Sequence, residues 1–317
     1  MNVLIVGLGQ IGGSIGLNLV TRKLVAHVAG HDLDKTESHL AMRKKGAHSI
    51  APTLAQGLAQ ADLVILAVPT WEIIKLLPEI AQYIPDGSAI LDVGSTKTEI
   101  LKAVNRCHKR IDFIGGHPLA GTEGHGFASA NPEIFLGAIF ALVPAPGTDK
   151  NWVRQIKYLV AALGAKPLMI SPEDHDRLMA ITSGLPYLIS LSLMNLAITT
   201  ARHEPVIWKL TAGSFRSATR VAASSPKLTM DLLLTNKDYI IEALDKFIRE
   251  LSAQKEIISR GDKNSLGRLI SKTHKLIHSC LHKIKKLLFH LMNHNRFCLI
   301  LLLFHPIFYL SILPLYI

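Results

Sequence analysis

A glycine-rich turn near the start of the chain constrains the fold more than any other feature. Residues 7–14 read GLGQIGGS and follow directly on the apolar run Asn2–Val6. In the spacing Gly7-x-Gly9-x-x-Gly12, the first glycine allows a tight turn and the second lets a pyrophosphate approach the backbone. The third lets a helix pack closely on a strand, and that helix presents unpaired N–H groups to phosphate. The pattern predicts a dinucleotide-binding unit.

An acidic residue in the expected place favours NAD over NADP. A second predicted strand, Ala26–Gly30, leads to Asp32, which lies 20 residues after Gly12. A carboxylate there can hydrogen-bond both ribose hydroxyls and repels a 2′-phosphate. The alternative is that Asp32 caps a helix over Lys35–Lys45. The predicted cofactor-binding residues are Gly7, Gly9, Gln10, Ile11, Gly12, Asp32, Val68 and Pro69.

Strand and helix signals alternate through the first half of the chain. Continuous apolar runs are typical of strands that are buried on both faces of a parallel sheet. The further strands predicted in this way are Leu63–Val68, Ser88–Asp92, Asp112–Gly115, Ala138–Val143 and Pro167–Ile170. With helices between them, they predict a doubly wound parallel sheet of the Rossmann type, class α/β, over residues 1–170.

The pattern changes to helices from Ser171 onward. Ser171 is a good N-cap with Pro172 at the first helical position. The run Leu178–Ile198 is apolar around most of its circumference, which indicates a helix buried on several sides, either inside a helical domain or in a dimer core. Further helices are predicted over Pro205–Leu210, Lys227–Leu234 and Lys237–Ile258, which gives an all-helical domain over residues 171–280.

Composition argues against several classes of function. The net charge is +11, but ten Lys and Arg and two acids from Leu251 onward give +8, which leaves +3 for the first 250 residues. A net charge this close to zero in the first 250 residues does not indicate nucleic-acid binding. The three cysteines have no CxxC spacing and predict neither a metal site nor a disulfide framework. The first strand begins at residue 2, so we expect no signal peptide and a cytoplasmic enzyme.

Residues 281–317 form a basic and then apolar tail that we expect to lie outside the fold. Its end, Phe297–Ile317, has 21 apolar-rich residues, a length that permits a membrane span. His305, Pro306 and Pro314 weaken that interpretation. The alternatives are an extension foreign to the fold, left disordered or self-associating, and a packed terminal helix. Apart from this tail we predict no membrane contact.

The strongest chemical signal outside the glycine turn is GGHPLAGTEGHG at residues 115–126. The segment follows a predicted strand, so it lies at the carboxyl edge of the sheet, where such sheets bind ligands. His117 is the candidate general base. Ser95, in the loop after the preceding strand, could reach the imidazole and fix its tautomer. The alternatives are that His117 is an ordinary loop histidine and that Ser95 caps a helix from Thr96.

Six motifs together carry a resemblance to a known family. They are GLGQIGGS (7–14), DVGSTK (92–97), GGHPLAGTEGHG (115–126), PEDHD (172–176), SGLP (183–186) and GSFRSATR (213–220). Over roughly residues 1–275 the chain resembles the prephenate/arogenate dehydrogenase family of tyrosine biosynthesis, and it looks most similar to the cyanobacterial type. The resemblance implies a nucleotide-binding domain and a helical dimerisation domain that builds a homodimer. It also implies NAD(P)-dependent oxidative decarboxylation of prephenate, arogenate or both.

The resemblance also assigns residue roles. His117 matches the histidine that hydrogen-bonds the ring hydroxyl of the substrate as hydride leaves. Ser95 matches a serine near that histidine and the nicotinamide, and the two residues form the predicted catalytic set. Arg216 matches an arginine that binds a substrate carboxylate, for which a guanidinium offers bidentate geometry. Thr122 and Gly184 complete the predicted substrate-binding set.

Two departures from the family pattern keep other functions open. Gly184 stands where the family usually has a histidine, and Ser217 where it usually has an aspartate. His175 receives no role, and we expect it at the surface or an interface of the first turn of its helix. One alternative is another NAD-dependent dehydrogenase of the β-hydroxyacid type, which usually uses a helix lysine as acid/base. The other is a non-catalytic NAD-binding paralogue.

Overall fold

The computed structural model describes residues 1–122 and 124–293, with side chains up to residue 279. The predictions for the apolar end Phe297–Ile317 lie outside the described residues. Residues Met1–Ala243 form one compact unit, and the chain from Leu244 onward belongs to a second.

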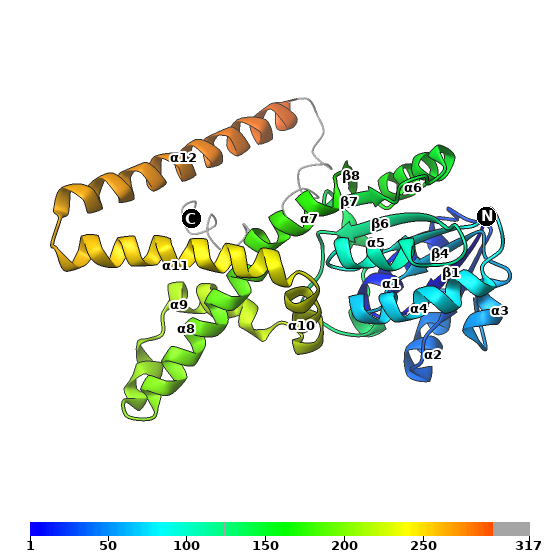
Figure 1. Cartoon of the computed structure of the whole chain (residues 1–317), viewed down its shortest axis with the longest axis horizontal. Coiled ribbons are helices and arrows are strands. Elements are labelled where there is room, and N and C mark those ends of the chain that lie inside the picture. Colours follow the sequence, from blue (N-terminus) through cyan, green and yellow to red (C-terminus); the bar gives the residue numbers. More distant parts are fainter. Residues whose placement is uncertain (123, 294–317) are drawn as a thin grey trace. The chain divides into compact units, whose positions relative to one another are not determined.

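An eight-stranded sheet forms the centre of the first unit within the described residues (Figure 1). Its order is β3-β2-β1-β4-β5-β6-β7-β8. The strands are β1 (Asn2–Val6), β2 (His27–His31), β3 (Ser49–Ile50), β4 (Leu63–Leu66), β5 (Ala89–Asp92), β6 (Asp112–Pro118), β7 (Ile139–Pro144) and β8 (Lys166–Met169). The direction of winding reverses beside β1, and ligands of such sheets bind at this reversal, at the carboxyl ends of the strands. The predicted Rossmann-type fold is confirmed.

Strand β7 departs from the all-parallel sheet predicted from the sequence. It runs antiparallel to β6, with Gly116 opposite Leu142, whereas the other strand pairs are parallel. In its described part, the connection between β6 and β7 contains only the 3₁₀ turns η1 (Phe127–Ser129) and η2 (Pro132–Phe135). A parallel return usually runs through a crossover helix, and this connection, residues 119–138, has no α-helix in its described part.

Helices cover both faces of the sheet and complete its core (Figure 1). On one face pack α1 (Gln10–Thr21), α2 (Lys35–Arg43) and α6 (Lys150–Ala162). On the other pack α3 (Leu54–Leu58), α4 (Thr70–Tyr83) and α5 (Thr98–Asn105). Side chains alternate along a strand, so Ile5 belongs to the first core layer and Leu4 to the second.

After β8 the chain is helical. The elements are α7 (Pro172–Met179), a π turn η3 (Ala180–Gly184), α8 (Leu185–Ala201), η4 (Pro205–Leu210), α9 (Gly213–Thr219), η5 (Arg220–Ala223), α10 (Pro226–Thr235), α11 (Lys237–Ser259) and α12 (Lys263–Asn293). Ser171 caps α7 as predicted, because its hydroxyl accepts a hydrogen bond from the Asp174 N–H. Helix α12 continues through residue 280, where we predict the end of the helical domain.

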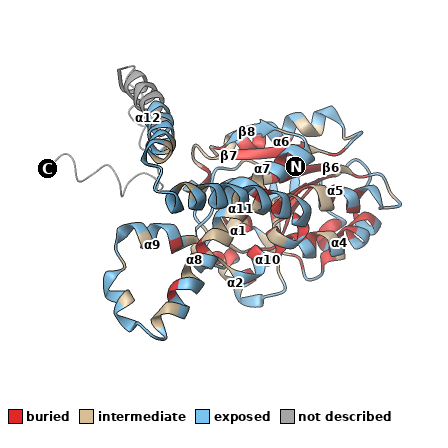
Figure 2. Ribbon diagram, turned by 60° about the vertical axis from the view of Figure 1, so that its left-hand side comes forward, coloured by how far each residue is buried: buried red, intermediate tan, exposed pale blue. Residues whose placement is uncertain are grey.

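Helix α8 is only partly buried, and most of its apolar residues are half-exposed. Its buried residues are Ser190 and Ala197, while Leu196 is 65% exposed. Figure 2 shows red concentrated on the sheet and its flanking helices, and little of it along α8 and α9. The residues of a single chain therefore do not bury this helix on several sides, and its place in a dimer core stays a prediction. The segment Pro172–Ala201 is also long and apolar enough to cross a membrane by length and composition alone.

Candidate active site

The glycine turn forms an open cradle at the carboxyl end of β1. Gly7 has a φ of +92°, and a Cβ atom on Gly12 would lie 2.0 Å from the Gly7 carbonyl oxygen. A Cβ atom on Gly9 would instead meet nothing within 4 Å. The turn thus needs glycine at two positions for its backbone and leaves open space at the third. The first N–H groups of α1 lack helical acceptors, so these residues fit a dinucleotide pyrophosphate.

Three other predicted cofactor residues surround the cradle. The Cγ1 atom of Val68 lies 2.8 Å from where a Cβ atom on Gly7 would stand, so Val68 supports the turn from below. Pro69 occupies the N-cap position of α4. Ile11 is half-buried and packs against the core beneath α1.

Gln10 ties the glycine turn to the loop that follows His117. Its Nε2 atom donates to the Thr122 hydroxyl at 2.6 Å, and its Oε1 atom accepts from the Thr122 N–H at 3.0 Å. Thr122 also accepts from the Gly124 N–H at 3.2 Å. Two residues that the sequence assigns to different ligands are therefore hydrogen-bonded to each other.

Asp32 braces the glycine turn from the end of β2. Its carboxylate accepts from the Leu8 N–H at 2.7 Å and from the Asp34 N–H at 2.9 Å. The alternative that Asp32 caps α2 is wrong, because the cap is Asp34, which accepts from the Thr36 N–H at 2.7 Å. A carboxylate has about four lone-pair sites, so Asp32 can still accept from a ribose hydroxyl.

A buried ion pair lies beneath the carboxyl edge of the sheet. Lys97 is fully buried, and its ammonium donates to the Asp92 carboxylate and, at 2.6 Å, to the Gly116 carbonyl oxygen. Asp92 also accepts from the N–H groups of Gly94 and Gly116. Burial lowers the pKa of Lys97, and the Asp92 carboxylate offsets part of that effect. The sequence analysis missed this pair, although an acid at a strand end five residues before a lysine was a usable signal.

His117 begins a chain of three hydrogen-bonded side chains. Its Nδ1 atom lies 2.9 Å from Nε2 of His175, and Nδ1 of His175 lies 2.8 Å from Oδ1 of Asp176. His175 and Asp176 are 2% and 1% exposed. The Asp176 carboxylate also accepts from the N–H groups of Lys97 and Thr98, at 2.8 Å each. The chain is thus anchored on the first turn of α5.

Two predictions around this chain are wrong. The sequence predicts His175 at a surface or interface, but α7 packs against α5 and buries the imidazole. It also offers Ser95 as the cap of a helix from Thr96, but α5 begins at Thr98 and Asp176 caps it from α7. Ser95 is half-buried and forms no hydrogen bond within the described residues. The signal for the missed pair was a histidine directly followed by an acid.

Burial and neighbouring charges set the protonation states of the chain. Burial lowers the pKa of His117 well below its ordinary value, and the Lys97 ammonium lowers it further. Burial raises the pKa of Asp176, but hydrogen bonds from His175, Thr98 and Lys97 outweigh this and leave the pKa below its usual value. At neutral pH the site therefore holds a neutral His117 and an ionised Asp176.

The predicted substrate-binding residues lie on separate elements, with Thr122 in the loop after β6, Gly184 in η3 and Arg216 on α9. Arg216 is exposed on α9, which packs on α8, and the adjacent Ser217 is exposed as well. Gly184 is buried at the end of the π turn, and a Cβ atom there would lie 2.1 Å from Cδ1 of Ile240 on α11. Ile240 therefore fills the space that a histidine at position 184 would need, which gives a physical reason for this departure from the family pattern.

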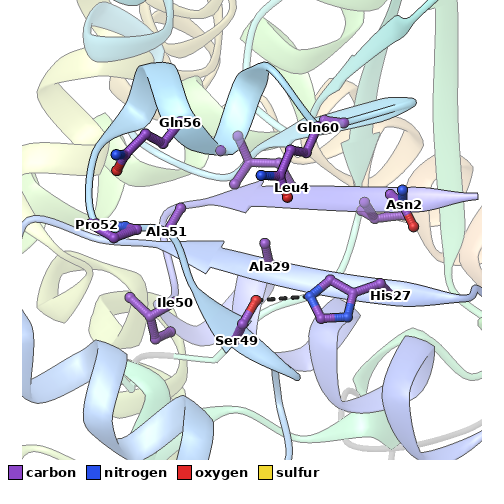
Figure 3. A pocket seen from close by; sticks show the side chains of 13 residues that line it. Asn2, Leu4, His27, Ala29, Ser49, Ile50, Ala51, Pro52, Gln56 and Gln60 are labelled. Carbon is purple, nitrogen blue, oxygen red and sulfur yellow. Dashed lines mark hydrogen bonds between the residues drawn. The ribbon is translucent and has the colours of Figure 1, made fainter.

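A separate groove lies along β1, β2 and β3 beside α3 (Figure 3). It has a volume of about 540 Å³, and in it Nε2 of His27 lies 2.8 Å from the Ser49 hydroxyl. The five-residue helix α3 leaves this part of the sheet face uncovered. None of the predicted site residues lines the groove.

Comparison with known proteins matches almost the whole described chain. A family model for the nucleotide-binding domain of prephenate dehydrogenase matches residues 15–169, and one for the dimerization domain of prephenate dehydrogenase matches residues 171–272. The prephenate dehydrogenase of Bacillus subtilis is 33% identical over 268 residues, which cover 84% of this chain and 72% of that protein. The cyclohexadienyl dehydrogenase of Zymomonas mobilis is 30% identical over 264 residues, with coverages of 82% and 89%.

A solved structure extends the similarity to three dimensions. The prephenate dehydrogenase of A. aeolicus, in complex with hydroxyphenyl propionate and NAD+, superimposes with a TM-score of 0.82 at 26% identity. The match covers 88% of this chain and 98% of that one.

Proposed function

This chain belongs to the prephenate dehydrogenase family, and we propose that it oxidises prephenate, arogenate or both with NAD and releases the ring carboxylate as carbon dioxide. The single observation that carries the proposal is the place of His117. It lies at the carboxyl end of β6, it is bonded to His175, and its loop is tied to the glycine cradle through Gln10. A proton acceptor and a dinucleotide site therefore meet at one edge of the sheet.

In the proposed reaction His117 holds a proton for a short time. Bound NAD supplies the hydride acceptor. As hydride leaves the ring carbon that bears the hydroxyl, Nε2 of His117 takes the hydroxyl proton. When the bond from the ring to its carboxylate breaks, the electron pair of that bond enters the ring and the oxygen regains the proton. Aromatisation supplies the driving force, so the protein chiefly positions the substrate and excludes water.

The cofactor would be held by the residues around the cradle. Gly7, Gly9 and Gly12 leave room for the pyrophosphate, and Gln10, Ile11, Val68 and Pro69 shape the walls. Asp32 would accept from the ribose hydroxyls and repel a 2′-phosphate, which makes NAD the preferred cofactor over NADP.

We assign the substrate carboxylate to Arg216 and further substrate contacts to Thr122 and Gly184. Arg216 forms no ion pair within the described residues, so its guanidinium remains available for a bidentate contact. Ser95 is assigned to the hydroxyl and nicotinamide side of His117.

The helical part would complete the enzyme as a homodimer. The dimerization-domain match supports this assembly. The exposed apolar side chains of α8 supply a surface that a second copy of the chain could cover. We assign residues 1–170 to the nucleotide-binding domain and 171–280 to the helical domain. A cytoplasmic location stays a prediction.

One assay separates this function from its rivals. Prephenate and arogenate are each supplied with NAD and with NADP, and NADH or NADPH formation is followed together with the aromatic product. We expect turnover with NAD and release of 4-hydroxyphenylpyruvate or tyrosine. NAD binding without turnover of either substrate would instead identify a non-catalytic paralogue. Turnover of a small β-hydroxyacid alone would favour the other dehydrogenase type.

A further inference from the structure

We propose that His175 and Asp176 are positioning residues that hold His117 in a single tautomer, with the proton on Nδ1 and the lone pair of Nε2 facing the substrate. The inference rests on the proposed function, because it states how His117 is kept ready to accept the hydroxyl proton. It concerns two residues to which the family resemblance assigned no role.

The direction of each hydrogen bond in the series His117–His175–Asp176 follows from the carboxylate at its end. Asp176 is ionised and can only accept, so the Nδ1 atom of His175, 2.8 Å away, must carry the proton. In the proposed arrangement this is the only proton on His175, so the lone pair of that ring lies on Nε2. Since that atom lies 2.9 Å from Nδ1 of His117, His117 must donate through Nδ1. Its Nε2 atom is left as the acceptor.

Asp176 is itself held in place on three sides. Its carboxylate oxygens accept from the N–H groups of Lys97 and Thr98, at 2.8 Å each. Its main-chain carbonyl accepts from Nδ2 of Asn236 at 2.8 Å. Because rotation of the carboxylate would break two hydrogen bonds in a buried place, the orientation of both imidazoles is fixed by the backbone at the start of α5.

The same three side chains and the nearby Lys97 favour transient protonation of His117. When Nε2 of His117 takes the proton, the ring becomes an imidazolium and its Nδ1–H bond to His175 strengthens, with Asp176 opposite in charge at the far end. The buried Lys97 ammonium, paired with Asp92, opposes that charge from beneath. The acceptor is therefore supported during hydride loss and still returns its proton when the ring becomes aromatic.

The test uses three variants of the full-length protein and one readout that does not depend on activity. In His175→Leu the acceptor for His117 is lost, in Asp176→Asn the carboxylate is lost, and in His175→Gln an amide oxygen replaces the Nε2 acceptor. We expect the first two to lower kcat by ~10–150-fold, the range for a lost hydrogen bond to a charged group, with KM for NAD unchanged. His175→Gln should return kcat to within ~10-fold of the original. His39→Leu, at an exposed site on α2, is the matched control.

Imidazole ¹⁵N NMR reports the tautomer directly, with His117→Asn used to assign the resonance. The neutral His117 should carry its proton on Nδ1 in the original protein and lose this preference in His175→Leu and Asp176→Asn. A proton on Nε2 in the original protein, or an unchanged kcat in folded His175→Leu, would overturn the inference. If the protein turned over neither substrate, the proposed function would fail, while the NMR measurement would still decide the tautomer.

Discussion

The two halves of the first compact unit bury their apolar side chains in different ways. In residues 1–170 the sheet is covered on both faces, and all four residues of β4 are buried. In residues 171–243 only two of the 17 residues of α8 are buried, and Leu210 just beyond it is 75% exposed. The first half completes its core with its own residues, whereas the second leaves an apolar surface that another surface must cover.

We call residues 1–170 the closed half and residues 171–243 the open half. Most of the groups that could handle the proton lie in or against the closed half. His117, Lys97 and Asp92 all lie at its carboxyl edge, and α7 adds His175 and Asp176 to them. Variants at this edge should therefore act on the chemical step. Variants on α8 and α9 should act on assembly and on substrate binding.

The largest effect is expected at His117 itself. His117→Ala should lower kcat by ~10²–10⁴-fold, the usual contribution of a positioned acid/base, while NAD binding stays intact. The control is His125→Ala, which removes an exposed imidazole from the same loop. Steady-state kinetics and nucleotide titration measure both quantities. Near-normal kcat in folded His117→Ala would remove His117 from the mechanism.

A smaller effect, on binding, is expected at Arg216 in the open half. Loss of a charge-assisted pair with a carboxylate should raise KM for the substrate by ~10–150-fold in Arg216→Ala. Arg216→Lys keeps the charge without the bidentate fork and should give an intermediate KM. If KM for NAD rose instead, the carboxylate assignment would be wrong.

Assembly should respond at α8 and not at an equally exposed site of the closed half. Leu196→Glu places a charge on the apolar surface and should weaken the dimer by ~10–100-fold, since a buried leucine contributes ~1.5–3 kcal/mol. Tyr158→Glu on α6, where the tyrosine is 71% exposed, should leave the dimer unchanged. Sedimentation over a range of protein concentrations gives both constants. Equal behaviour of the two variants would contradict the comparison.

The pH profile should reflect the closed environment of His117. Its pKa is lowered by burial and by the Lys97 ammonium, so the neutral, proton-accepting form still predominates at pH 6.5. The value of kcat/KM should change by less than about 10-fold between pH 8 and pH 6.5 and fall only when the pH drops through the lowered pKa. An acid limb centred above pH 6.5 would show that the imidazole is not shielded as described.

The smallest effect concerns the packing of Gly184. Gly184→Ala should destabilise the protein by about 1 kcal/mol, because the new methyl group meets Ile240. In an Ile240→Ala background the same change should stabilise by ~0.5–1 kcal/mol, the usual gain from replacing a helical glycine. Urea denaturation of the four proteins of this cycle measures the coupling. Additive effects would show that Ile240 does not restrict position 184.

Local patterns predicted much of the fold, and contacts between distant segments account for the errors. The continuous apolar runs predicted β1 with its bounds and β4 within two residues. The two-residue β3 has no such run and was missed, and the direction of β7 depends on a loop with no helical signal. His175 looked like a residue of an exposed first turn, because its partner His117 lies 58 residues earlier.

The pairing of Gln10 with Thr122 has a consequence for the order in which ligands arrive. Gln10 is the first residue of α1, and Thr122 lies five residues after His117, so one side-chain amide joins the nucleotide cradle to the catalytic loop. A nucleotide bound at the glycine turn should therefore also order the loop that contacts the substrate. We expect sequential binding with the nucleotide first, and a substrate dissociation constant that falls once the nucleotide is in place.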